Sequence, residues 1–140
     1  MRKWLLPMAL ALALLLGWIP SISYTEDEDP VLLARTLYAL CRDESYETKL
    51  AIGAVVMNRV ESVWFADTLE GVLTEQMQFP TAQRYDEASL QAARAVLSGT
   101  RVLSRDALYY QIADAREPLN ERYQVASVGG YRFFSQSGRL

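Results

Sequence analysis

The spacing of apolar residues changes once along this chain, and the change limits the folds that are open to it. Between residues 31 and 98, apolar residues recur every three or four positions, as on one face of a helix. Between residues 107 and 134, short runs rich in tyrosine and β-branched residues surround the pair Gly129-Gly130, a pattern typical of strands joined by a turn. Helices followed by a small antiparallel sheet predict an α+β domain, and no glycine-rich phosphate loop is present.

Cap residues and breaks in the pattern give the predicted elements their bounds. Asp29 and Pro30 predict the start of the first helix, and Asp86 and Gly99 bracket the last one. Gly53 would let the second helix approach a neighbour closely. We expect helices at 30–41, 47–60, 68–75 and 87–98, and strands at 107–112, 123–128 and 131–134.

The first residues have the layout of a secretory signal. Two basic residues precede an apolar run over 4–19, which ends before Ser21-Ile22-Ser23. The prediction is a signal peptide at 1–23, an acidic spacer at 24–29 and one domain at 30–140, secreted to the cell wall or another extracytoplasmic place. The run is shorter than the roughly 20 residues that span a bilayer, but an uncleaved membrane anchor stays an alternative.

Composition removes several classes of function. The chain has no histidine, so histidine triads and histidine–zinc sites are excluded, and proton transfer must use carboxylates, tyrosines or water. Cys41 is the only cysteine, which excludes an internal disulfide and a thiolate metal site and predicts a small buried side chain. The net charge is −3 and the arginines are scattered, so nucleic acid is not an expected partner.

Five separated segments resemble one family. Residues 32–60, LLARTLYALCRDESYETKLAIGAVVMNRV, are similar to the opening of the SleB-type cell-wall hydrolases, which include spore cortex-lytic enzymes. The later segments that match this family in order are Gln78-Phe79, the alanine-rich 92–99, the tyrosine-containing 107–110 and the closing 128–134. The resemblance covers nearly all of residues 31–134.

The resemblance implies a lysozyme-like domain that binds peptidoglycan glycan strands. Its members resemble lytic transglycosylases, which cut the bond between N-acetylmuramic acid and N-acetylglucosamine. One glutamic acid protonates the departing oxygen and then draws a proton from the sugar's own 6-hydroxyl, unlike the paired carboxylates of ordinary glycosidases. The resemblance implies no metal and no organic cofactor.

The sequence departs from the family at the residue that matters most. The glutamate used as the acid aligns with Leu40, and a leucine can neither give nor take a proton. Losing a positioned general acid typically costs about 10² to 10⁴ in rate, which puts activity in doubt. Further departures replace a family glycine, proline, glycine and histidine with Asp43, Ser45, Thr48 and Tyr131.

Glu44 is the candidate for a displaced acid. It follows Leu40 by four positions and would share a helix face with it, at roughly 5–6 Å between Cβ atoms, if the helix continued. Its alternatives are sugar binding or loop support, or an ordinary solvated charge. Glu47 is expected to stabilise the start of the second helix. Asp67, Glu70 and Glu75 stay open as carboxylates that could reach residue 40.

The substrate-binding candidates each have a plainer alternative. Gln78 and Phe79 could line a glycan groove or belong to a loop packed on the core. Tyr109 and Tyr110 point to opposite sides of a strand, so one is expected in the core and the other at the groove. Arg132 could bind a lactyl or peptide carboxylate or form a surface ion pair.

Three further residues were interpreted from their positions. Trp64 would suggest carbohydrate contact if it is exposed in its loop, and core packing if it is buried. Asn58 and Arg59 are interpreted as capping the end of the second helix.

Two functional hypotheses follow. The first is a secreted peptidoglycan-cleaving enzyme of the lytic transglycosylase type. The second is a catalytically silent homologue that binds glycan or regulates a working hydrolase. Its further partners would be other cell-wall proteins, and the membrane if the first segment is uncleaved.

Overall fold

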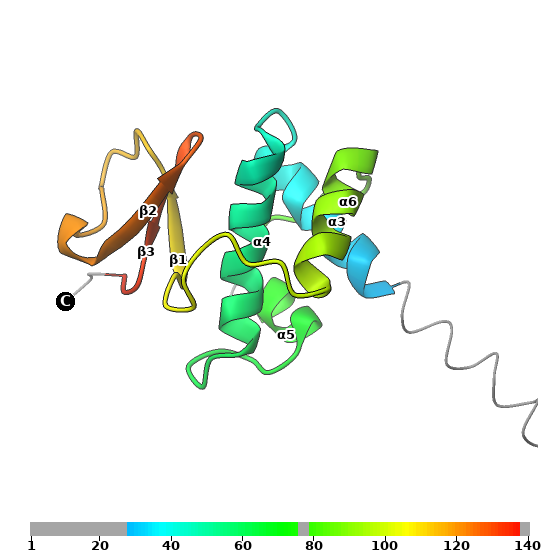
Figure 1. Cartoon of the computed structure of the whole chain (residues 1–140), viewed down its shortest axis with the longest axis horizontal. Coiled ribbons are helices and arrows are strands. Elements are labelled where there is room, and N and C mark those ends of the chain that lie inside the picture. The colour runs from blue at the N-terminus through cyan, green and yellow to red at the C-terminus, as the bar shows by residue number, and fades with distance from the viewer. Residues whose placement is uncertain (1–27, 76–78, 138–140) are drawn as a thin grey trace, which may run out of the picture.

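The structure, a computed structural model, describes residues 28–75 and 79–137 and consists of helices followed by a sheet. The α+β prediction is confirmed (Figure 1). The predicted signal segment, residues 24–27 of the spacer and Gln78 lie outside the described residues. The elements are α3 (Glu28–Cys41), α4 (Tyr46–Val60), α5 (Leu69–Thr74), α6 (Glu87–Leu97), β1 (Tyr109–Ile112), the 3₁₀ helix η2 (Glu121–Tyr123), β2 (Gln124–Val128) and β3 (Tyr131–Phe134).

The helix starts follow their capping residues. The Ser45 side chain accepts a hydrogen bond from the Thr48 backbone N–H, and Asp86 does the same for Ser89 at the predicted start of α6. The first helix begins at Glu28, two residues earlier than predicted, so Glu28 and Asp29 lie in its first turn, where the helix dipole favours carboxylates. None of the helices in the described ranges is long and apolar enough to cross a membrane.

The core lies where α3, α4 and α6 pack together. Its fully buried side chains include Leu37 of α3, Val55 of α4 and Val96 of α6. A Cβ atom added to Gly53 would lie 2.7 Å from Val96 Cγ2, which confirms that this glycine permits a close helix contact. Cys41 is 2% exposed, as predicted for a small buried side chain.

The sheet has β3 at its centre, paired antiparallel with β1 on one side and β2 on the other. Ile112 and Val128 both pair with Tyr131, and Tyr109 pairs with Phe134. Figure 1 shows α4 between the sheet and the other two long helices, and α4 contacts both β1 and β2. The two parts of the domain therefore meet along α4.

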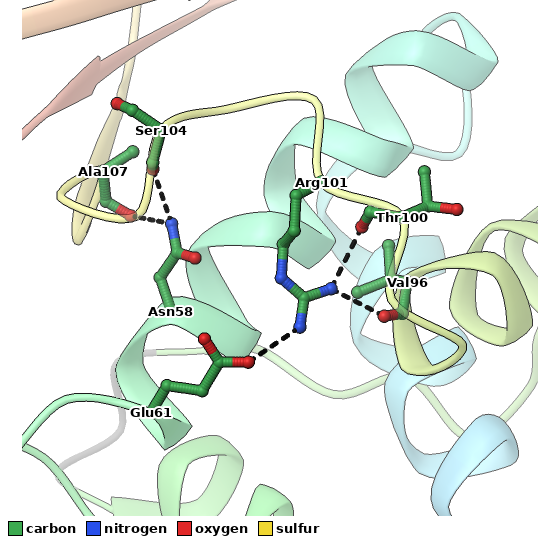
Figure 2. Close-up of polar contacts among 7 residues, drawn as sticks. All are labelled: Asn58, Glu61, Val96, Thr100, Arg101, Ser104 and Ala107. Atoms are coloured by element: carbon green, nitrogen blue, oxygen red, sulfur yellow. Dashed lines mark hydrogen bonds and ion pairs between the residues drawn. The ribbon is translucent and has the colours of Figure 1, made fainter.

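The last turn of α4 holds the loop that leads to the sheet, which corrects one prediction. Asn58 Nδ2 donates to the carbonyl oxygens of Ser104 and Ala107, at 2.9 and 3.0 Å, as Figure 2 shows. Arg59 Nε donates to the Leu108 carbonyl at 2.7 Å. The prediction that these residues cap α4 is wrong, because their donors satisfy carbonyls of an irregular segment 46 or more positions away.

A second set of polar contacts joins the same loop to α6. The Arg101 guanidinium donates to the carbonyls of Val96 and Thr100 and to Glu61 Oε1, the last at 3.1 Å (Figure 2). The segment between α6 and β1 is thus held at two places, by Glu61 through Arg101 and by Asn58 and Arg59 through backbone carbonyls.

Candidate functional site

Residue 40 lies where the last turn of α3 meets the start of β3. The Tyr131 hydroxyl donates to the Leu40 carbonyl oxygen at 2.7 Å, although 91 positions separate the two residues. This bond satisfies one of the carbonyls that a helix leaves unpaired at its C-terminal end. The Leu40 side chain is half-buried and packs against the core. Residue 40, where the resemblance predicts the family's acid, is therefore built into the helix–sheet junction.

Glu44 directs its carboxylate at the turn between β2 and β3. The Gly130 backbone N–H donates to Glu44 Oε2 at 3.4 Å. Cβ atoms added to Gly129 and Gly130 would each lie 2.7 Å from a Glu44 carboxylate oxygen, and Gly129 has a φ of +54°. The turn closes around this carboxylate because both of its residues lack a side chain, and the contacts give Glu44 a structural task.

Lys49 on α4 also holds the loop that carries Glu44. Lys49, on α4, is 2% exposed, and its ammonium group donates to the carbonyl oxygens of Glu44 at 2.6 Å and Arg42 at 3.2 Å. The Ser45 and Thr48 hydroxyls lie 3.0 Å apart and share a hydrogen bond. The α3–α4 loop is therefore held through its backbone.

Burial keeps the neighbouring titratable groups neutral. It raises the pKa of the Cys41 thiol to about 12 and that of the Tyr110 phenol to about 12, against the opposing effect of Arg59 on Tyr110. The pKa of Tyr131 is raised by burial first, and then by Cys41 and Glu44. None of these groups is a good acid or base near pH 7, and Asp67, Glu70 and Glu75 are exposed on the described surface.

Phe79 and Tyr110 pack against each other behind this junction. Their rings stack at 5.5 Å between centroids, and Tyr110 lies 6.0 Å from the Tyr131 ring. Phe79 is only 5% exposed and belongs to the core, as the plainer of its two alternatives requires. Tyr110 also packs against the core. Of the strand's two tyrosines, Tyr110 is thus the one directed inward.

Tyr109 lines a separate surface pocket of about 400 Å³. The residues around it are Trp64, Phe65, Leu108, Tyr109, Ser135, Gln136 and Ser137. Trp64 is 83% exposed, and the sequence associates an exposed Trp64 with carbohydrate contact. The sequence did not predict the polar wall of this pocket, which consists of Ser135, Gln136 and Ser137. Only Trp64 and Tyr109 were candidate residues in this region.

The Arg132 side chain forms its polar contacts with residues at the start of β2 and in η2. Its Nε donates to Gln124 Oε1 at 2.9 Å, and its guanidinium forms an ion pair with Glu121 at 3.1 Å. These contacts agree with the surface ion pair that was its alternative to carboxylate binding. Among the described residues, no group of three acidic or cysteine side chains could hold a metal ion.

Comparisons with known proteins agree on one kind of relative. A family model described as Cell Wall Hydrolase matches residues 43–134. The chain is 32% identical over 127 residues to a spore cortex-lytic enzyme of Oceanobacillus iheyensis, covering 84% of this chain and 46% of that protein. It is 34% identical over 114 residues to a spore cortex-lytic enzyme of Bacillus subtilis, covering 76% and 37%. The chain thus spans less than half the length of these relatives.

Solved structures give the same result for the fold. The catalytic domain of the Bacillus cereus SleB protein matches with a TM-score of 0.67 and 26% identity, covering 76% of this chain and 88% of that one. The catalytic domain of the germination-specific lytic transglycosylase SleB from Bacillus anthracis matches with a TM-score of 0.68 and 26% identity, covering 77% and 94%.

Proposed function

The chain belongs to the cell wall hydrolase family, and from this premise we propose that it binds the glycan strands of peptidoglycan without cleaving them. The family acts on peptidoglycan, which lies outside the cytoplasm, and export through the predicted signal segment would bring the domain there. The matched solved structures are catalytic domains, and the described helices and sheet correspond to that part of the relatives.

The observation that carries the proposal is the leucine at residue 40, the position at which the resemblance predicts the family's acid. Breaking a glycosidic bond requires a proton donor within hydrogen-bond reach of the bridging oxygen. Leu40 offers only a hydrocarbon side chain, and the neighbouring Cys41 and Tyr131 hold their protons too firmly to replace it, as their raised pKa values indicate. The rest of the fold is kept, so binding can persist where proton transfer does not.

The test separates binding from cleavage in one preparation. The full chain is incubated with purified peptidoglycan, bound protein is measured by co-sedimentation, and released anhydro-muropeptides are measured by mass spectrometry. We expect the wild type to sediment with peptidoglycan and to release no products. Leu40→Glu should release products at about 10² to 10⁴ times the wild-type background. Leu40→Gln is the matched control, because glutamine has the same shape as glutamate but cannot donate a proton as an acid. This variant should release no anhydro-muropeptides.

One observation favours a second candidate, in which Glu44 is a displaced acid that still allows cleavage. Its carboxylate contributes to the raised pKa of Tyr131, whose hydroxyl is bonded to the Leu40 backbone, so the carboxylate lies within electrostatic range of the junction. If the wild type does release anhydro-muropeptides, Glu44→Gln should abolish the release and Glu47→Gln, on the exposed first turn of α4, should not. That pair of results would replace the non-cleaving proposal.

A further inference from the structure

Resting on the peptidoglycan-binding function proposed above, we propose that the pocket beside Trp64 is a separate saccharide-binding site, which holds a sugar ring of the glycan strand against the indole. The position of this pocket distinguishes it from the junction at residue 40. Gly130, at one end of β3, contacts Glu44, and Ser135, just beyond the other end, lines the pocket. Five residue-to-residue steps of extended chain separate Gly130 from Ser135 by about 16 Å.

The lining matches the two-sided chemistry of a sugar ring. A pyranose has an apolar face of C–H groups and an edge of hydroxyls, so it needs an aromatic surface on one side and hydrogen-bonding groups on the other. Trp64 and Phe65 supply the aromatic side, while Ser135, Gln136 and Ser137 supply hydroxyl and amide groups. Among the described residues, those that line the pocket carry no carboxylate and no ammonium or guanidinium group, which favours a neutral ligand.

Packing contacts within the protein hold Phe65 and Tyr109, which form the floor of the pocket. The Arg59 guanidinium, 4% exposed, lies 4.6 Å from the Phe65 ring and 5.4 Å from the Tyr109 ring. Those two rings meet edge to face at 6.0 Å. The Asn58 hydrogen bonds in Figure 2 fix the segment that leads to Leu108 and Tyr109. A ligand would therefore pay little to order the aromatic floor.

The exposure of two adjacent apolar side chains in the loop at 61–67 favours a binding partner. Val63 and Trp64 are 91% and 83% exposed, and a tryptophan of this exposure places a large apolar surface in water. A membrane surface could also bind these two exposed side chains. However, the loop from Glu61 to Asp67 contains two acids and no basic residue, which disfavours an anionic lipid surface, and Trp64 faces a pocket with a polar wall.

Tryptophan fluorescence can report on this site alone. The chain has three tryptophans, and Trp4 and Trp18 lie in the predicted signal segment. In the full chain carrying Trp4→Phe and Trp18→Phe, all tryptophan emission comes from Trp64. We expect a tetramer of N-acetylglucosamine, and separately purified glycan strands, to shift this emission to shorter wavelength in a saturable manner.

Substitutions then test the energetic role of the indole. In the otherwise wild-type chain, Trp64→Ala should weaken tetramer binding, measured by calorimetry, about tenfold or more, because it removes the stacking surface. Gln136→Ala should weaken it by a smaller factor. Val63→Ala, the neighbouring exposed residue that does not line the pocket, should bind within about twofold of the wild type. Circular dichroism checks that each variant is folded.

The outcomes distinguish failure of the site from failure of the function. If the wild type binds peptidoglycan while Trp64→Ala binds equally well and the emission does not change, this site is refuted and the proposed function stands. If the wild type binds neither the tetramer nor peptidoglycan, both are refuted. If Trp64→Ala loses binding to phosphatidylglycerol–phosphatidylethanolamine vesicles but not to glycan, the loop is a membrane contact and the saccharide site is refuted.

Discussion

The glycine turn at 129–130 can be tested by adding one methyl group at a time. Gly129→Ala places a Cβ atom in a left-handed residue and against both the Thr48 hydroxyl and the Glu44 carboxylate. Gly99→Ala is the matched control, because Gly99 also has a positive φ, of +112°, but nothing lies within 4 Å of its added Cβ. The pair separates backbone strain from crowding at the Glu44 site.

The magnitudes follow from these two contributions. A left-handed backbone costs a non-glycine residue about 1–2 kcal/mol, and crowding in a packed site adds about 1–3 kcal/mol. Gly129→Ala should therefore lower the free energy of unfolding by about 2–5 kcal/mol. Gly99→Ala should lower it by about 1–2 kcal/mol through strain alone. Gly130→Ala meets the same carboxylate at 2.7 Å but has neither the Thr48 contact nor a positive φ, so its cost should be about 1 kcal/mol, at the lower end of the crowding range.

A double-mutant cycle identifies the partner. Combining Gly129→Ala with Glu44→Ala removes one of the two colliding groups, so the double variant should be more stable than additivity predicts, by at least about 0.5 kcal/mol. The combination of Gly99→Ala with Glu44→Ala should be additive. Urea unfolding of the full chain, followed by circular dichroism, measures all of these free energies. Additivity in both cycles, or equal costs for the two glycine variants, would refute the placement of the Glu44 carboxylate in the turn.

Three further predictions concern groups around the same junction. Tyr131→Phe leaves the half-buried Leu40 carbonyl without its 2.7 Å donor and should lower the free energy of unfolding by about 1–2 kcal/mol in urea; a loss below about 0.5 kcal/mol would contradict the bond. Hydrogen bonds from Ser89 lower the pKa of Asp86 below 3.8, so its carboxylate stabilises the fold at neutral pH, and this contribution is lost as the pH falls through the lowered value. The melting temperature of Asp86→Asn, which keeps a capping oxygen, should thus fall below that of the wild type above about pH 5 and converge with it near pH 2. Because burial raises the pKa of Cys41 to about 12, a thiol reagent at pH 8 should leave it unmodified in the folded chain and modify it in urea; rapid native labelling would show that the core opens there.

The local patterns predicted the elements well because each depends on neighbouring residues. The cap at Asp86, the close contact at Gly53 and the β3 bounds all rest on a few adjacent positions, and the structure confirms them. The sequence pattern does not predict the extension of α3 back to Glu28, because it assigns residues 24–29 to an acidic spacer with Asp29 as the cap, although acids also favour the first turn of a helix.

The site could not be predicted in the same way because its contacts are long-range. Glu44 meets Gly130 across 86 positions, and Asn58 meets Ala107 across 49. Sequence spacing says which side chains share an element, but not which carbonyl on another element needs a donor. The polar wall of the Trp64 pocket has the same origin, since residues 135–137 reach it only after β3 pairs with β1.

The contacts that shape the junction explain why position 40 can hold a leucine. Tyr131 binds the Leu40 carbonyl, Lys49 binds the carbonyls of Arg42 and Glu44, and Glu44 accepts from the Gly130 N–H. Every one of these bonds ends on a backbone atom, so none depends on which side chain stands at residue 40. A leucine at residue 40 therefore leaves the arrangement of the loop and the sheet intact, and under the proposed function Leu40→Glu should supply a proton donor to an already formed site. Its cost in stability is then limited to the packing that a half-buried leucine provides, about 1–3 kcal/mol at most.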